Sequence, residues 1–512
     1  MKIKILDCTL RDGGYYSNWD FSESLYATYL KCMQKLPVDI IEIGYRSFPK
    51  KDYFGKFYYC PGYVLEECRR MAPSKLISLM LNERDVAAAG VNELLKDIRE
   101  YADIIRLAVD PKRLDHAVKL AGEIKKTGFQ VGFNLMYMSE LIKNKDILKK
   151  LDVLHDCVDY FSLVDSYGGV FPSEVTDIVQ TVKEVLHIPV GFHGHNNIEM
   201  ALANTLSAID AGCEIVDTTV AGMGRGAGNL KTELLLTLFN RKIQLDVDYN
   251  ALSEITGVFS DLLQQYRWGT NLPYMVSGVN SLPQKDVMDW VTKRFYSFNG
   301  IIQALNNKKT GVEDNIKLPV FEPAKKYRQA VIVGGGELAS EHATGVKEFI
   351  RKQKDVCLIH ASSKNAKHYE DVLTDVFFCL VGNEGHRMES VFGHPDVFSG
   401  CCILPPYPRK MGTYVPSKVQ DKSFELSRIT FTDQYLDSHT VLAIQTAIGL
   451  GVEKVLLAGY DGYSNMVITA KERDLIIENE YSFMKASSVL SVESLLPTQY
   501  TVPTCSLYSY LS

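Results

Sequence analysis

The sequence of 512 residues lacks several features that mark particular classes of protein. No stretch reaches the roughly 18 uninterrupted apolar residues that a membrane-spanning helix needs. The first residues show neither the apolar core nor the small-residue cleavage site of a signal peptide. Basic residues are not in excess, because the formal net charge is -6. These absences predict a protein with neither a membrane nor a nucleic-acid partner.

The eleven cysteines form no C-x-x-C pair and follow no regular spacing. Cys8, Cys213, Cys357 and Cys379 lie inside apolar runs typical of strands, where buried free thiols are expected. Together with the missing signal peptide, they predict a cytoplasmic location. The composition, 46% hydrophobic and 23% charged, is typical of a globular protein. Since a single core rarely grows past about 250–300 residues, we expect two domains.

The first part of the chain alternates short apolar runs with amphipathic helical patterns, such as residues 22–36 and 111–127. The runs are almost continuously apolar, as expected of strands covered on both faces. Such an alternation implies right-handed βαβ units and a parallel sheet. Eight units in about 230 residues predict a (β/α)8 TIM barrel, and a doubly wound open sheet is the competing architecture. The predicted strands are residues 3–8, 40–45, 76–81, 104–109, 131–135, 160–164, 190–195 and 215–220.

The chain is predicted to continue with a helical extension and a second domain. We assign residues 1–245 to the barrel and residues 246–320, which are mostly helical and aromatic-rich, to helices that extend it. Residues 321–512 again alternate strands and helices, which predicts a Rossmann-like α/β domain. The whole protein is therefore expected to belong to the α/β class.

A glycine-rich turn follows the first strand of the predicted second domain. Gly334-x-Gly336-x-x-Ala339 loosely matches a dinucleotide-binding fingerprint. The next strand ends at His360 without the acidic residue that would bind a ribose, so a tight strand-to-helix turn is the preferred interpretation. Residues 459–463, Gly-Tyr-Asp-Gly-Tyr, follow a later strand and are a second candidate ligand loop.

Polar residues come late in several of the eight barrel strands. Active sites of such barrels lie at the carboxyl ends of the strands, so these side chains are expected to meet at one mouth. They are Arg11 and Asp12 after the first strand, Glu42 in the second, Arg106 in the fourth, Asp165 and Ser166 after the sixth, His193 and His195 in the seventh, and Asn229 in the glycine-rich loop after the eighth.

The pair His193 and His195 predicts a metal site. Residues i and i+2 of a strand point to the same side, and Asp12 comes from a strand that lies close to the seventh in a closed barrel. Two imidazoles and a carboxylate leave positions open for substrate and water, as in catalytic metal sites. Oxygen and nitrogen ligands without a thiolate favour Mn2+ or Mg2+, with Co2+ and Zn2+ as alternatives. The competing interpretation is that one histidine belongs to the core.

Arg11, next to the candidate ligand Asp12, suggests enolate chemistry. A fixed cation at this place would stabilise the charge that develops on a keto oxygen. The alternative is that Arg11 only pairs with Glu42 or Asp165. For Arg106 an ion pair and a catalytic role are equally open. We take Glu42, Arg106, Asp165 and Ser166 as candidate substrate contacts.

Three motifs resemble the HMG-CoA lyase-like family of metal-dependent TIM barrels, above all its 4-hydroxy-2-oxovalerate aldolases. They are LDCTLRDGG at residues 6–14, GFHGHNN at 191–197 and AGMGRGAGN at 221–229. The resemblance covers about residues 1–300. It implies a divalent cation on Asp12, His193 and His195, approached by Asn229, with Arg11 stabilising an enolate. It further implies a carbon–carbon lyase that acts on a 4-hydroxy-2-oxo acid through a metal-bound pyruvate-type enolate.

The chain departs from the aldolases in one position. These aldolases have a proton-transfer histidine shortly after the R-D-G motif, whereas here Gly14 is followed by Tyr15. Tyr15 and, from the helices after the barrel, Tyr274 are the candidate replacements. The loop after the eighth strand lacks the cysteine of the acyl-CoA lyases. A Claisen-type acyltransferase similar to isopropylmalate synthase and an inactive metal-binding scaffold remain the alternative functions. Whether the protein forms a homo-oligomer is left open.

Overall fold

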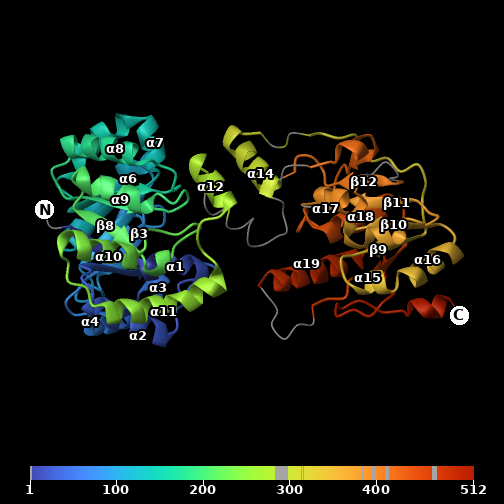
Figure 1. Ribbon diagram of the computed structural model, residues 1–512, viewed down its shortest axis with the longest axis horizontal. Coiled ribbons are helices and arrows are strands. Elements are labelled where there is room, and N and C mark those ends of the chain that lie inside the picture. Colours follow the sequence, from blue (N-terminus) through green and yellow to red (C-terminus); the bar gives the residue numbers. More distant parts are fainter. Residues whose placement is uncertain are drawn as a thin grey trace. The chain divides into compact units, whose positions relative to one another are not determined.

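The computed structural model describes residues 3–282, 287, 298–312, 314, 316–382, 384–393, 399–409, 414–463 and 470–511. The chain divides into two compact units, Met1–Val287 and Met288–Ser512. Figure 1 colours the first unit from blue to green and the second from yellow to red. The finer boundaries at residues 245 and 320 stay a prediction.

The first unit is a closed barrel of eight parallel strands in the order β1 to β8 (Figure 1). Strands β1 and β8 close it, with Lys4 opposite Ile215 and Asp7 opposite Thr218. The predicted barrel is therefore confirmed, and the alternative of an open sheet is wrong for this unit. The strands are β1 (Lys4–Asp7), β2 (Ile40–Tyr45), β3 (Leu76–Asn82), β4 (Ile104–Val109), β5 (Gln130–Leu135), β6 (Tyr160–Asp165), β7 (Val190–Gly194) and β8 (Ile215–Thr218).

Helices surround this barrel, and their apolar faces form one large core with the outward-facing strand residues. In α6, for example, Leu120, Ala121 and Ile124 are fully buried and the last turn carries two lysines. The helices are α1 (Thr9–Ser17), α2 (Glu23–Lys35), α3 (Lys56–Tyr59), α4 (Gly62–Met71), α5 (Val91–Leu95), α6 (Leu114–Lys126), α7 (Met138–Lys143), α8 (Pro172–Val185), α9 (Ala201–Asp210), α10 (Thr232–Ile243), α11 (Tyr249–Tyr266) and α12 (Leu272–Val279). Nowhere in the described ranges is a helix both long and apolar enough to cross a membrane.

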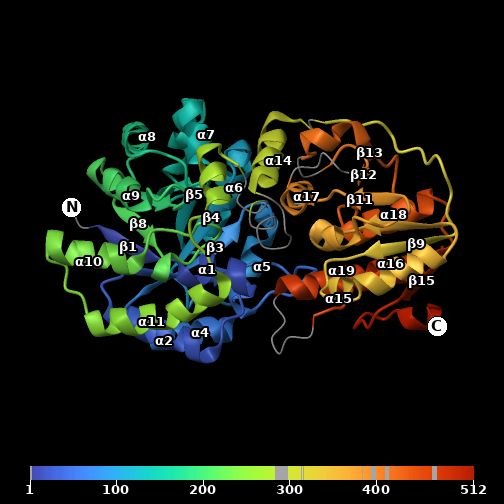
Figure 2. The ribbon, with the colours of Figure 1, turned by 45° about the vertical axis from the view of Figure 1, so that its right-hand side comes forward.

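The second unit contains a parallel sheet of seven strands in the order β13-β12-β11-β10-β9-β14-β15. Its alternate residues enter two different cores: Ile332 packs with α18 and α19 residues, and Val331 packs with α16 residues. Helices thus cover both faces (Figure 2), which confirms the Rossmann-like α/β domain. Its elements are α14 (Phe298–Thr310), β9 (Gln329–Val333), α15 (Leu338–Glu341), α16 (Ala343–Lys352), β10 (Val356–His360), β11 (Val376–Cys379), α17 (Glu384–Phe392), β12 (Cys401–Leu404), β13 (Ser423–Glu425), α18 (His439–Gly449), β14 (Lys454–Ala458), α19 (Ala470–Ala486) and β15 (Ser491–Ser494).

All eleven cysteines are free thiols. Cys8, Cys213, Cys357 and Cys379 are buried, as predicted. Burial raises the pKa of each of these thiols, which keeps it protonated and unreactive. The cytoplasmic location itself stays a prediction.

Candidate active site

Arg11 and Asp12 lie in the first turns of α1, directly after β1. Two glycines follow them because other side chains occupy the space of a side chain there. A Cβ on Gly14 would lie 2.1 Å from the Trp19 ring, and a Cβ on Gly13 would lie 2.6 Å from the Met223 sulfur. The Trp19 indole also donates to the Arg11 carbonyl at 2.8 Å. The packing of Trp19 and Met223 against the glycines thus fixes Arg11 and Asp12 at the barrel mouth.

A cavity of about 180 Å³ opens at this mouth. Its walls come from the carboxyl ends of several strands and the loops that follow them. The lining residues are Arg11, Asp12, Tyr15, Tyr45, Met80, Asn82, Glu83, Arg84, Ala108, Asp110, Asn134, Met136, Tyr137, Val164, His193, His195 and Arg225.

Asp12, His193 and His195 converge on this cavity, as the spacing predicted. One ligand atom of each lies within 4.8 Å of the others, and all three residues are buried. The Nδ1 atom of His193 lies 2.9 Å from Asp217 Oδ2, and Nδ1 of His195 lies 2.8 Å from a backbone carbonyl oxygen. Each Nδ1–H therefore donates to an oxygen, which leaves both Nε2 atoms as electron-pair donors toward Asp12.

The protonation states of these groups match those of metal ligands. Burial, and next the neighbouring His193, lower the pKa of His195 to about 3. Burial by itself raises the pKa of Asp12, but Arg11 and the two imidazoles outweigh it and hold this pKa below its usual range. His195 is therefore neutral and Asp12 ionised at neutral pH, which are the forms that bind a divalent cation.

Asn229 completes this group. Its Nδ2 donates to Asp12 Oδ2, while its Oδ1 is buried and has no hydrogen-bond partner among the described residues. An unpartnered amide oxygen on a residue that bonds to the candidate ligand Asp12 is itself a suitable ligand. The residues at this site therefore fit a divalent cation.

A second group of potential ligands, Cys8, His193 and Asp217, lies beneath the first. The pKa of the Cys8 thiol is raised far above its usual value by burial, and its Sγ lies 3.5 Å from the carbonyl of Thr218. Asp217 already accepts from Arg106 at 2.6 Å. Because its thiol is protonated and its carboxylate is paired, this group is a poor cation site.

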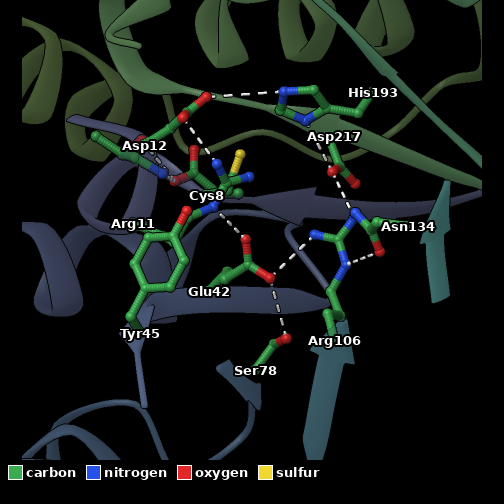
Figure 3. A network of polar contacts seen from close by, with 12 residues as sticks. Cys8, Arg11, Asp12, Glu42, Tyr45, Ser78, Arg106, Asn134, His193 and Asp217 are labelled. Atoms are coloured by element: carbon green, nitrogen blue, oxygen red, sulfur yellow. Dashed lines mark hydrogen bonds and ion pairs between the residues drawn. The ribbon is translucent and has the colours of Figure 1, made fainter. Parts of the chain in front are cut away.

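A series of paired buried charges connects the candidate ligands Asp12 and His193 (Figure 3). Arg11 bonds to Asp12 Oδ1 and to Glu42 Oε1, both at 2.7 Å. Glu42 accepts from Arg106 at 3.1 Å, and Arg106 donates to Asp217 at 2.6 Å. Opposite charges alternate along this series, so each buried charge is paired, and breaking one pair would leave a costly isolated charge.

The structure places the predicted substrate contacts around the cavity rather than on its lining. Glu42 and Arg106 belong to the series of paired buried charges. The Asp165 carboxylate accepts from the backbone N–H of Gly169 at 3.2 Å, and burial raises its pKa to about 7. Ser166 Oγ accepts from the backbone N–H of Tyr137 at 2.9 Å. Direct contact with substrate stays a prediction for all four residues.

The two predicted tyrosines differ in position. Tyr15 lines the cavity, and its hydroxyl lies 3.1 Å from that of Tyr45. Tyr274 is buried and absent from the cavity lining, and burial raises the pKa of its phenol. Of the two, only Tyr15 is brought together with Arg11 and the candidate ligands.

Sequence reasoning missed several residues of the site. Asp217 fixes His193, yet it lies inside the eighth strand, where its neighbours Ile215 and Val216 are apolar. An acidic residue inside an otherwise buried strand was the available signal, because such a charge needs a partner. Asn134, which accepts from Arg106 at 3.1 Å, and Tyr45 were also missed.

In the second unit, the glycine-rich turn after β9 is occupied by an acidic side chain. Asp461 Oδ2 accepts from the backbone N–H of Leu338 at 2.9 Å, where α15 begins. A Cβ on Gly336 would lie 2.5 Å from Asp461. A carboxylate therefore stands where a dinucleotide phosphate would bind, which supports the interpretation as a structural turn.

Comparisons with known proteins agree with this geometry. The family model described as HMGL-like matches residues 99–258. The chain is 29% identical over 270 residues to a 4-hydroxy-2-oxovalerate aldolase of Pelotomaculum thermopropionicum, covering 52% of this chain and 78% of the relative. It is 30% identical over 247 residues to the enzyme of that name from Chloroflexus aurantiacus, covering 46% and 69%.

A solved structure matches the same part of the chain. It is the N-terminal domain of a candidate aldolase from Bacteroides vulgatus, with 51% sequence identity and a TM-score of 0.57. The match covers 59% of this chain and 100% of that one.

Proposed function

This chain belongs to the HMGL-like family and is a carbon–carbon lyase, and we propose that it cleaves, or forms by aldol addition, a 4-hydroxy-2-oxo acid at the barrel mouth. The observation that carries the proposal is the convergence of Asp12, His193 and His195 on a cavity that Arg11 also lines. The relatives do not favour a Claisen-type acyltransferase or an inactive scaffold.

Asp12, His193, His195 and Asn229 would hold a divalent cation, Mn2+ or Mg2+ by their donor atoms, with Co2+ and Zn2+ as alternatives. When bound, such a cation polarises the keto group of a 2-oxo acid as a Lewis acid.

Arg11 would stabilise the charge that develops on the keto oxygen. Glu42 and Asp12 hold its Nε and Nη1 atoms at 2.7 Å, while its Nη2 has no hydrogen-bond partner in the described part of the chain. A guanidinium held in this way is preorganised, so it needs no reorientation when charge develops. In this arrangement Glu42, and through it Arg106, would position Arg11.

The reaction also requires proton transfer. A base takes the proton of the 4-hydroxyl group, the C3–C4 bond breaks, an aldehyde leaves, and a proton then reaches C3 to give pyruvate. We assign this transfer to Tyr15, which lines the cavity and whose hydroxyl lies 3.1 Å from that of Tyr45. Burial, and next Tyr15, raise the pKa of Tyr45, so Tyr45 would stay protonated and donate to the Tyr15 oxygen. Tyr274 stays the second candidate.

The test measures pyruvate release from 4-hydroxy-2-oxovalerate by the purified full chain. We expect release to stop after chelation, to return with Mn2+, and to be absent in His195→Ala. His187→Ala, which removes an exposed histidine of the same unit, should behave as wild type. Release that survives both chelation and His195→Ala would overturn the proposal.

A further inference from the structure

The cavity continues from the candidate cation ligands to the opposite side of the barrel mouth. The ligands lie in α1 and at the carboxyl end of β7 or just after it, whereas a second group of lining residues lies at or just after the carboxyl ends of β3, β4 and β5. Strands β3 and β7 lie opposite each other in a closed order of eight. We name this second group the far wall, and its polar members are Asn82, Glu83, Arg84, Asp110 and Tyr137.

The position of the far wall relative to Arg11 and the cation ligands determines which part of a substrate would contact it. In the proposed reaction, Arg11 and the cation ligands would engage the carboxylate and keto end of a 2-oxo acid. The carbon chain beyond C3 would then extend across the mouth, and the aldehyde formed or consumed there would meet the far wall. The reaction proposed above makes no use of the five far-wall residues.

The far wall is polar and its charges are nearly balanced. Arg84 forms an ion pair with Asp110, and Asn82 donates to Asp85 at 3.1 Å. Glu83 is fully buried and accepts from Arg113 Nε at 2.8 Å. Paired carboxylates and guanidinium groups leave no excess positive charge, so this wall does not suit a phosphate.

The same groups are poorly matched to an alkyl chain. The Arg84 side chain is 54% exposed, so its guanidinium keeps water contacts that a methyl group would displace without replacement. A hydroxyl group both donates and accepts, and it can therefore bond to a carboxylate, a guanidinium or an amide.

Tyr137 at the rim of the far wall has a constrained backbone. Its φ of 62° lies in the left-handed region, which is uncommon for a residue other than glycine. Ser166 Oγ accepts from its backbone N–H at 2.9 Å, and its ring lies 5.4 Å from that of Tyr167. Tyr137 is the residue before α7, and these two contacts hold it at the cavity lining.

We propose that the far wall selects a neutral polyhydroxylated aldehyde over a short aliphatic one. The inference rests on the proposed function and adds the substrate class. In the aldol direction, C3 of pyruvate loses a proton and bonds to the aldehyde carbon, and the aldehyde oxygen gains a proton. The product would be a 3-deoxy-2-oxo sugar acid.

The experiment separates the two proposals. Deuterium exchange at C3 of pyruvate in D2O, followed by NMR on the Mn2+-loaded full chain, reports enolisation without any aldehyde. Aldol addition is then compared for glyceraldehyde and propanal, which have the same chain length, and for glyceraldehyde 3-phosphate. We expect kcat/KM for glyceraldehyde to exceed that for propanal by about 100-fold and that for the phosphate by at least about tenfold.

Two variants assign the preference to the far wall. Arg84→Met and Asn82→Leu should each lower the ratio of kcat/KM for glyceraldehyde to that for propanal by about tenfold, and this ratio does not depend on how reactive each aldehyde is by itself. Arg70→Met is the matched control, because Arg70 is 74% exposed and its ion pair with Glu67 is long, at 3.9 Å.

Each outcome decides one of the two proposals. If C3 of pyruvate exchanges, three results would each overturn the inference. They are a kcat/KM for propanal that equals or exceeds that for glyceraldehyde, a preference for the phosphorylated aldehyde, and an unchanged ratio of kcat/KM in both far-wall variants. Absence of both exchange and cleavage would overturn the proposed function, and the inference with it.

Discussion

The carboxyl ends of the parallel strands differ between the two units. In the barrel, one ligand atom each of Asp12, His193 and His195 converge, and the buried Oδ1 atom of Asn229, whose Nδ2 bonds to Asp12, has no hydrogen-bond partner among the described residues. In the second unit, Asp461 Oδ2 accepts from the start of α15, and Glu384 accepts from a backbone N–H at 2.6 Å. Polar residues late in a strand therefore do not by themselves make a site, because several unpaired donor atoms must also face one point.

The largest effect on activity is expected from removing one of the ligands that converge in the barrel. Asp12→Asn keeps the size of the side chain but removes the carboxylate charge that a cation ligand supplies. We expect pyruvate release to fall at least about 1,000-fold, which corresponds to about 4 kcal/mol of transition-state stabilisation. The measurements are kcat and the bound Mn2+ by elemental analysis.

Asp461→Asn is the matched control in the second unit, since it makes the same chemical change at a strand end where the carboxylate caps a helix. It should keep the activity and metal content of the wild type. A similar loss of activity in both variants would show that the two strand ends are not functionally different.

A smaller effect on metal affinity is expected at Asp217, which contacts the candidate ligand His193 rather than the cation itself. Asp217→Asn weakens the hydrogen bond that orients His193 and removes a partner of Arg106. Losing such a partner of a ligating histidine lowers metal affinity by about 10–100-fold, which titration with Mn2+ would measure as Kd. Asp177→Asn, at a position whose side chain is 59% exposed, is the control. An unchanged Kd in Asp217→Asn would refute the positioning role.

The two units should also respond to pH with opposite signs. Burial lowers the pKa of His360 to about 3 in the second unit, so the unfolded state binds one proton more than the folded state between about pH 3 and 6.5. Burial raises the pKa of Asp165 to about 7 in the barrel, so there the folded state binds the extra proton. His360 therefore destabilises its unit as pH falls, and Asp165 destabilises the barrel as pH rises toward 7.

For His360 we expect the opening free energy of β10 to fall by about 2 kcal/mol from pH 7 to pH 5. Hydrogen exchange of β10 amides, corrected for the intrinsic pH dependence of exchange, gives this quantity. His360→Phe should remove the slope, because Phe378 stacks on the His360 ring with 4.8 Å between centroids and would accept another aromatic ring. His368→Gln, at an exposed position, should keep the slope, and a slope that persists in His360→Phe would refute the assignment.

Strand periodicity predicted the barrel and the histidine pair because both depend on local spacing. It did not predict that Arg11 and Asp12 lie in a helix, since Gly13 and Gly14 disfavour one. Their helix depends on the packing of Trp19, just after its end, and of Met223, which comes from the loop after β8.

The charge pairs of the far wall, and Arg106 as the partner of Asp217, could not be predicted from the sequence. Which charges pair across different strands is decided by the closure of the barrel and leaves no periodic signal in any one strand. A pattern in the sequence therefore locates the strand ends, but not the partners that the side chains find there.

The smallest expected effect tests the turn in the second unit. Asp461→Ala removes the carboxylate that accepts from the N–H of Leu338, and loss of such a cap costs about 1 kcal/mol. Hydrogen exchange of β9 and α15 would show this loss while aldol cleavage stays at the wild-type rate. If the turn were instead a nucleotide site closed by Asp461, removing the carboxylate would create affinity for a dinucleotide, and calorimetric titration with NAD would detect binding. Asp461 packs closely against Gly336 and accepts from the N–H of Leu338, as expected of a structural turn. We therefore expect a loss of stability and no binding of NAD.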